Sequence, residues 1–228
     1  MNKEGPGSDS RHDEALSIRW ATKADLKDIT WVIEHGFPDD PGCTYKFPQR
    51  KEFPKDFRKW TKLEYEEYLD QHNKFATLVV TAPVLSDTGA VVDRPISIGV
   101  WDVAPETKPT GGDRGIDERR DANPQHMRVY AAAAARGFKD HFAKYGNNQL
   151  NLWMLVTHPD YRCRGAATML CNWGQKESMK TGRILTVMAS PMGKELYEEL
   201  GYGVVGSVTA QVEGEEEKVE IDILEKRN

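Results

Sequence analysis

The stretch from Val156 to Leu170, VTHPDYRCRGAATML, constrains the fold of this 228-residue chain more than any other segment. An apolar run ends at His158, and a segment with helical spacing follows Gly165. Arg162 and Arg164 lie between the two. The first turn of a helix has free backbone N–H groups and a partial positive charge, and such helix ends bind phosphate. We therefore expect a strand, an anion-binding turn and a helix in succession.

The residues of this turn favour close approach of an anion. Gly165, Ala166 and Ala167 are small, and Arg162 and Arg164 would add fixed charge and fork-shaped donors. The Gly-Lys-Ser/Thr end of a Walker A loop is missing, and only one glycine is present where a dinucleotide fingerprint has three. The turn therefore predicts a pyrophosphate site of another kind. The alternative interpretation is an ordinary strand–helix turn that happens to carry arginines.

Hydrophobic periodicity predicts the other elements. Thr22 precedes Asp25 by three residues, a capping-box spacing that begins a helix. Segments 37–54 and 104–123 are polar or rich in proline, and we expect them to be loops, the second one mobile. Apolar runs and alternation indicate strands over 16–22, 75–84, 94–103, 149–159 and 183–190 and a hairpin over 204–223; helical spacing indicates helices over 23–36, 55–72, 127–145, 166–173 and 193–201.

This order of elements predicts a mixed α/β (α+β) fold. Residues 16–228 are expected to form one domain, and the polar segment 1–15 to be a disordered tail. The strand, helix and strand around Gly165 should form a right-handed crossover, because parallel neighbours are almost always joined with that hand.

The composition of the chain limits the kinds of partner that we expect for it. The formal net charge of −5 provides no basic face for a nucleic acid. No stretch approaches the roughly 20 apolar residues of a membrane span, and the N-terminus lacks the apolar region of a signal peptide. Cys43, Cys163 and Cys171 cannot all pair and match no zinc spacing. We therefore expect reduced thiols, a cytoplasmic protein and no membrane or nucleic-acid partner.

Two motifs point to a family. Residues 162–167, RCRGAA, follow the pattern Q/R-x-x-G-x-G/A, and the preceding LVTHPDY matches the end of a V-x-P-x-Y strand. Residues 190–202, SPMGKELYEELGY, are similar to N-x-x-A-x-x-L-Y-x-x-x-G-F. In this order and at this separation, the two motifs resemble those of the GNAT superfamily, the acyl-CoA-dependent N-acetyltransferases.

The resemblance implies a GNAT-like fold. Such a fold has a central mixed, mostly antiparallel sheet, a parallel strand pair splayed around the cofactor, and helices on both faces. The close match covers about 150–205, and the element order extends it to 16–228 with an insertion at about 105–148. This insertion suggests a lid or a built-up pocket over the acceptor.

The resemblance also implies roles. Acetyl-CoA would be the co-substrate, and no metal is expected. Backbone groups of Leu155 and Thr157 would bind the pantetheine arm, and an N–H near Val156 would polarise the thioester carbonyl. Tyr197 would protonate the leaving thiolate, because a phenol and a thiolate are of similar basicity. The other expected cofactor contacts are Arg162, Cys163, Arg164, Gly165, Ala166, Ala167, Thr168 and Ser190.

The sequence departs from the family pattern in two places. Ser190 replaces the asparagine that follows the fifth strand, and its hydroxyl has a shorter reach. Many members carry a glutamate base on the fourth or fifth strand, but neither strand has a carboxylate here. The candidates for the base are Glu34, His35, Asp102 and His126, each of which is otherwise an ordinary surface or loop residue.

The expected function is transfer of an acetyl group from acetyl-CoA to a small-molecule amine by direct attack in a ternary complex. The acceptor would bind between the first two helices, segment 36–53 and the insertion. Protein acetylation at lysine or an N-terminus is one alternative and needs an open groove; a non-catalytic acyl-CoA-binding protein is another. The sequence does not identify the acceptor, the acyl preference or the oligomeric state, and a homodimer is left open. Aromatic candidates for the acceptor pocket are Trp31, Phe37, Tyr45, Phe47, Trp101 and Tyr130.

Overall fold

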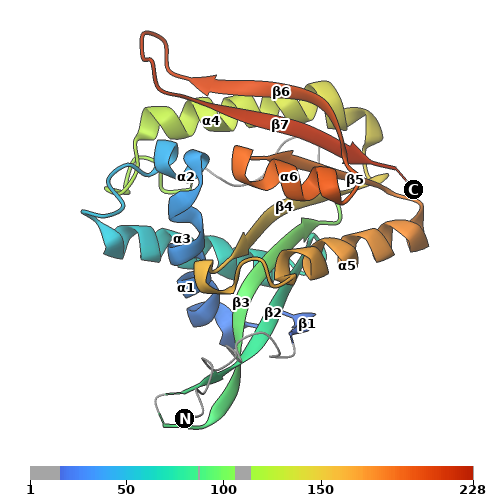
Figure 1. The fold of residues 1–228 in the computed structure, drawn as a ribbon. Helices are drawn as coiled ribbons and strands as arrows, with labels where there is room; N and C mark the ends of the chain where they lie inside the picture. The colour runs from blue at the N-terminus through green and yellow to red at the C-terminus, as the bar shows by residue number, and fades with distance from the viewer. Residues whose placement is uncertain (1–15, 87, 106–113, 228) are drawn as a thin grey trace, which may run out of the picture.

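The computed structural model describes residues 16–86, 88–105 and 114–227 (Figure 1). The predicted tail 1–15 and residues 106–113 of the predicted mobile loop lie outside these residues. The strands are β1 Ser17–Trp20, β2 Phe75–Leu85, β3 Val91–Asp102, β4 Gln149–Thr157, β5 Ile184–Ala189, β6 Gly203–Gln211 and β7 Lys218–Lys226. The helices are α1 Leu26–Gly36, α2 Pro41–Lys46, α3 Pro54–Asp70, α4 Pro124–Gly137, α5 Ala166–Thr181 and α6 Pro191–Glu199.

All seven strands belong to one mixed sheet of order β1-β2-β3-β4-β5-β7-β6. Only β4 and β5 run parallel; the other neighbours are antiparallel. The single parallel pair is joined through α5, as the predicted crossover requires. The predicted fold class is therefore confirmed.

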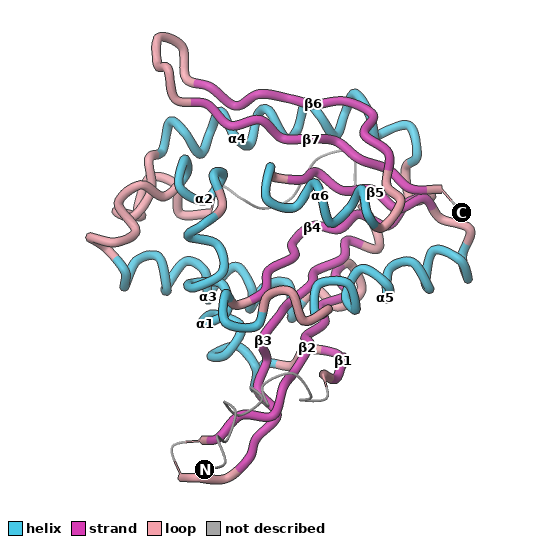
Figure 2. Tube along the Cα trace, viewed as in Figure 1, coloured by secondary structure: helices cyan, strands magenta, loops and turns pink. Residues whose placement is uncertain are grey.

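Helices cover both faces of the sheet. On one face α5 and α6 pack through Leu170 and Tyr197 against β2 to β5, and on the other α1 and α3 pack against β2 to β4. The helix α4 lies along the β6–β7 hairpin, through Ala133, Ala210 and Ile221 (Figure 2). Central strands are buried on both faces, which explains the continuous apolar runs of β2 and β4. None of the described helices is long and apolar enough to cross a membrane.

Two predicted boundaries are wrong. The segment 37–54 is not all loop, because Asp40 caps the short helix α2 and Pro41 occupies its first turn. The predicted helix 127–145 is α-helical only to Gly137 and then widens into a π turn over Phe138–Phe142. In that turn Phe138 and Phe142 both reach a cluster with Ile223 of β7, so tertiary packing decides how the helix ends.

The pairing of β4 with β5 stops halfway along the strands. It runs from Gln149 opposite Ile184 to Leu152 opposite Val187 and goes no further. At the next residue, Trp153, β4 has a bulge against β3. A bulge bends its strand and increases the local twist. Beyond Leu152, β4 follows β3 while β5 follows β7, and the sheet opens between them.

Candidate active site

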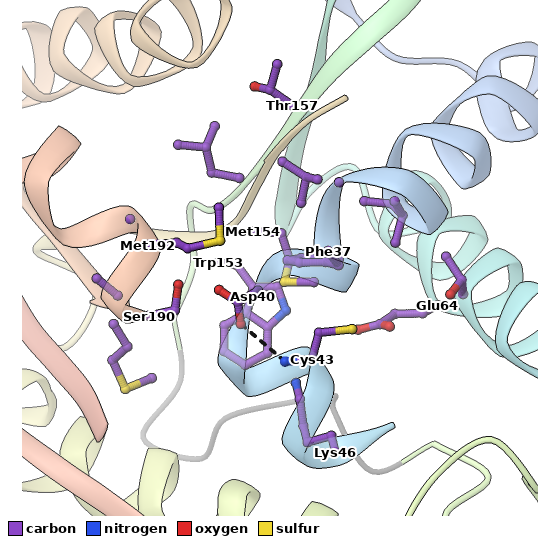
Figure 3. A pocket seen from close by; sticks show the side chains of 18 of the residues that line it. Phe37, Asp40, Cys43, Lys46, Glu64, Trp153, Met154, Thr157, Ser190 and Met192 are labelled. Atoms are coloured by element: carbon purple, nitrogen blue, oxygen red, sulfur yellow. Dashed lines mark hydrogen bonds between the residues drawn. The ribbon is translucent and has the colours of Figure 1, made fainter. Parts of the chain in front are cut away.

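The opening between β4 and β5 leads into a cavity of about 310 Å³. Met154, Leu155 and Val156 of β4 form one side, and Ala189 and Ser190 at the end of β5 form the other. The helices α1, α2 and α3 and part of segment 114–119 supply the remaining wall (Figure 3). The cavity therefore joins the strand gap to a chamber built from the N-terminal helices.

The turn between β4 and α5 fits an anion. Cys163 and Gly165 have φ values of 59° and 83°, in the left-handed region. Alternation of conformation in a turn of this kind points successive N–H groups to one side. The first backbone bond of α5 runs from the Met169 N–H to the Gly165 carbonyl, so the amides of residues 166–168 have no acceptor within the helix. An added Cβ at Gly165 meets nothing within 4 Å, so the glycine serves the backbone angle and leaves the approach open.

The two arginines of the turn are held by the protein. Arg162 donates from Nη1 to Asp39 Oδ2 at 2.7 Å and from Nη2 to the Gly36 carbonyl at 2.8 Å. Arg164 donates to the Asp160 carbonyl at 3.0 Å. Arg162 therefore ties this turn to the end of α1, and of the two arginines it alone lines the cavity.

The backbone of β4 presents alternate residues to the gap. The His158 N–H donates to the Ile96 carbonyl of β3 at 2.9 Å. Since successive N–H groups of a strand point to opposite sides, the N–H of Val156 is also directed to β3. Those of Leu155 and Thr157 are directed to the gap. The predicted donor near Val156 thus has two candidates in the neighbouring residues.

Tyr197 lies on α6 and lines the cavity. Its side chain is 6% exposed and lies 5.7 Å, ring centre to ring centre, from Tyr202. Burial raises the pKa of Tyr197 well above 10, and nearby Cys171, Tyr202 and Asp40 raise it further. The phenol is therefore protonated across the physiological range. An added Cβ at Gly193, one turn earlier, would lie 3.0 Å from the Tyr197 ring, so the glycine allows close packing there.

The predicted cofactor residues all lie at this gap and turn. Those that line the cavity itself are Leu155, Val156, Thr157, Arg162, Ala167, Ser190 and, with the predicted acid role, Tyr197. Cys163, Arg164, Gly165, Ala166 and Thr168 form the adjoining turn and the start of α5. Their contacts with a cofactor stay predictions.

None of the four candidate bases lines the cavity. Glu34 pairs with Arg58 at 2.7 Å on the surface, and Asp102 pairs with Lys74 at 3.2 Å. The His35 imidazole contacts the Trp31 carbonyl. His126 contacts the Tyr45 carbonyl and Glu215.

Two carboxylates that the sequence analysis missed do line it. Asp40 caps α2, and its Oδ1 accepts from the N–H groups of Gly42 at 2.8 Å and Cys43 at 3.2 Å. Glu64 extends from α3 toward the same space (Figure 3). The Asp-Pro pair at 40–41 is a turn and cap signal, which could have located α2 and its aspartate. No local pattern marks Glu64.

The aromatic prediction is half right. Phe37, Phe47 and Tyr130 line the cavity. Trp101 packs against α5 instead, and its indole N–H donates to the Leu170 carbonyl. Besides Tyr197, the other aromatic residues that line the cavity are Phe57, Trp60, Tyr65 and Trp153, from α3 and β4. Of the remaining predicted residues, Tyr45 stacks on His126 and Trp31 on His158.

Known proteins with similar sequences or structures are acetyltransferases. No family model matches the chain. An acetyltransferase of Stachybotrys chartarum is 23% identical over 206 residues, which are 87% of this chain and 85% of that protein. A mosquito arylalkylamine N-acetyltransferase-like protein superimposes with a TM-score of 0.61 over 94% of this chain and 100% of its own, at 16% identity. The PaiA N-acetyltransferase of Thermoplasma acidophilum, solved with coenzyme A, gives 0.51 over 94% and 99% of the two chains, at 13% identity.

These similarities extend over nearly the whole chain, and the splayed strand pair and glycine turn lie where the two motifs predicted them. The resemblance inferred from the sequence is confirmed at the level of the fold: this chain has the fold of the GNAT N-acetyltransferases.

Proposed function

We propose that the chain is an acetyl-CoA-dependent N-acetyltransferase whose acceptor is the amine of a small molecule. One observation carries this proposal: the gap between β4 and β5 opens into a cavity that is lined by a buried phenol and by carboxylates. Bound acetyl-CoA supplies the acetyl group, which passes from its sulfur to the acceptor nitrogen. The pyrophosphate fits the amides of residues 166–168, which have no acceptor within α5.

Tyr197 is the proposed acid. When the acceptor nitrogen bonds to the acyl carbon, the carbon–sulfur bond breaks and the sulfur takes up a proton. Burial keeps the Tyr197 hydroxyl protonated, and the side chain lines the cavity, which supports this role. A donor of this kind contributes about 10²- to 10⁴-fold in rate.

Asp40 is the proposed base. An ammonium has no lone pair with which to attack, so it must first give up a proton. Among the carboxylates that line the cavity, Asp40 is the one whose charge raises the pKa of Tyr197, which means that it lies near the reacting end. Its Oδ1 is occupied by the cap of α2, which fixes the orientation of the carboxylate. Asp40 thus takes the place of the strand glutamate that this sequence lacks.

The shape of the chamber favours a small acceptor. The helices α2 and α3 and segment 114–119 surround it, and an added Cβ on Gly115 would lie within 2.5 Å of the Trp60 ring. A protein acceptor needs an extended groove, whereas a chamber lined by aromatic side chains suits a small molecule. The thiol-release assay described next distinguishes a small-molecule acceptor from the predicted alternative, a protein acceptor.

The test is a thiol-release assay with acetyl-CoA and three groups of acceptors: small primary amines, lysine peptides and peptides with free N-termini. We expect turnover with at least one small amine, an acetylated product by mass spectrometry, and little turnover with peptides. Preferred acetylation of peptides would contradict the small-molecule assignment. Tight acetyl-CoA binding without turnover across the whole panel would contradict the enzymatic one.

A further inference from the structure

Glu64 is held in place by a chain of hydrogen bonds that the proposed reaction does not use. The Trp153 indole N–H donates to the Tyr68 oxygen at 2.8 Å, and the Tyr68 hydroxyl donates to Glu64 Oε1 at 2.7 Å. Burial raises the pKa of Tyr68 well above 10, so its hydroxyl remains a donor. The orientation of the Glu64 carboxylate is therefore fixed by Tyr68 of α3, which is itself held by Trp153 of β4.

A buried polar group without a partner lies beside this carboxylate. Tyr65 is fully buried and lines the cavity, yet its hydroxyl oxygen has no hydrogen-bond partner in the described structure. Its pKa is raised by burial and then by the charge of Glu64, so the two groups are close. The Tyr65 oxygen is covered by protein atoms, so of these two groups Glu64 is the one that a ligand in the cavity reaches.

The charges of the cavity separate into two regions. Three of its cations are neutralised: Arg114 by Glu67, Arg119 by Asp121 and Arg162 by Asp39. Lys46 lies on the α2–α4 side, 4.3 Å from the centre of the Tyr130 ring.

Within the described residues neither Asp40 nor Glu64 has an ion-pair partner. The charge of Asp40 contributes to the raised pKa values of Tyr197 and Tyr130. The charge of Glu64 contributes to those of Tyr65 and Tyr68. The cavity thus has two carboxylates on different helices, one at the cap of α2 and one on α3.

We propose that Glu64 forms a subsite for a second cationic group of the acceptor, which makes the substrate a diamine or a similar dication. A carboxylate accepts charge-assisted hydrogen bonds from an ammonium, and the aromatic side chains of Trp60 and Trp153 line the same cavity. The proposal rests on the proposed function, because it takes the reacting amine to lie at Asp40. Glu64 is thereby a specificity-determining residue.

The test compares three acceptors with one five-carbon skeleton: diaminopentane, aminopentanol and aminopentanoate. For the unmodified protein we expect kcat/KM for the diamine to exceed that for the amino alcohol by roughly tenfold to a hundredfold, the range of a hydrogen bond to a charged group. Glu64→Gln keeps the shape and the bond from Tyr68 but removes the charge. It should raise KM for the diamine, leave kcat within about twofold, and bring the diamine and the amino alcohol to similar values.

Glu66→Gln is the matched control, since Glu66 is on the same helix but does not line the cavity. It should keep the preference for the diamine. Equal kcat/KM for the diamine and the amino alcohol in the unmodified protein would overturn the proposal. Preference for aminopentanoate would overturn it as well, and would assign recognition to Lys46.

Calorimetry on the CoA-loaded protein separates this proposal from the proposed function. Diaminopentane should bind more tightly than aminopentanol, and Glu64→Gln should abolish the difference, whether or not acetyl transfer occurs. If diamine binding depends on Glu64 but no amine is acetylated, the subsite stands and the enzymatic assignment fails. If amines are acetylated but diamine binding is indifferent to Glu64, the subsite fails alone.

Discussion

Tyr197 is the residue on which the proposed chemistry depends most directly. Tyr197→Phe removes one hydroxyl from a buried ring and should leave acetyl-CoA affinity within about twofold, while turnover falls by roughly 10²- to 10⁴-fold. Steady-state kinetics and calorimetry on the same sample measure both quantities. Tyr202→Phe is the matched control, because that ring is also buried and adjacent but does not line the cavity. Unchanged turnover in the Tyr197 variant would remove its acid role.

Asp40 caps α2 and is also the proposed base. Replacing one carboxylate oxygen by an amide nitrogen separates these two roles. Asn caps a helix as well as Asp does, so Asp40→Asn should keep α2 folded. It should lower kcat by about 10²-fold or more, because the acceptor must then lose its proton to solvent. The remaining rate should rise with pH until the acceptor amine is itself neutral. A variant with the pH–rate profile and kcat of the unmodified protein would exclude Asp40 as the base.

The helix α5 offers an internal control for the anion-binding turn. Gly165 precedes it and Gly182 follows it, both with left-handed φ and with open space around an added Cβ. Valine at either position imposes backbone strain of about 1–3 kcal/mol rather than a collision. Gly165→Val and Gly182→Val should lose similar stability in thermal unfolding. Only Gly165→Val should also lose acetyl-CoA affinity in calorimetry. Equal affinities in the two variants would contradict the proposal that the turn at Gly165 binds the pyrophosphate.

The end of β4 should make stability depend on pH. His158 stacks on Trp31 at 3.9 Å between ring centres, and burial lowers its pKa below the ordinary value near 6.5 despite the nearby Asp160. His35, Arg94 and Arg162 lower it further. As the pH falls below about 6.5, the unfolded chain takes up a proton that the folded one refuses, so the free energy of unfolding decreases.

Denaturant titrations at several pH values measure this dependence. His158→Gln has no group to protonate, so its free energy of unfolding should fall less between pH values near 7 and near 5. Identical slopes for the two proteins would show that other groups govern the acid limit.

At the scale of the whole molecule, the sequence predicts those parts of the site that are formed by residues adjacent in the chain. The turn around Gly165 and the helix that carries Tyr197 are short continuous motifs, and both could be located before the structure was known. The acceptor chamber could not. Its walls come from α1, α2, α3, β4 and segment 114–119, and Asp40 and Glu64 meet there only because the sheet brings these segments together.

The same reason explains the failed candidates for the base. His126 and Asp102 have suitable side chains, but the fold occupies them with Glu215 and Lys74, outside the cavity. A search by residue type alone has no access to such pairings. The sequence shows that the strand glutamate is missing, but Asp40, the proposed replacement, is brought to the cavity only by the three-dimensional fold.

The most direct test of the account is titration calorimetry of the whole chain with acetyl-CoA and, in parallel, with adenosine diphosphate. The turn at α5 and the open strand pair together predict micromolar binding of acetyl-CoA, and weaker binding of the nucleotide, which lacks the pantetheine arm that would lie against Leu155 and Thr157. No binding of either compound would contradict the account at its centre. The turn would then be an ordinary strand–helix connection in a protein that only shares the fold.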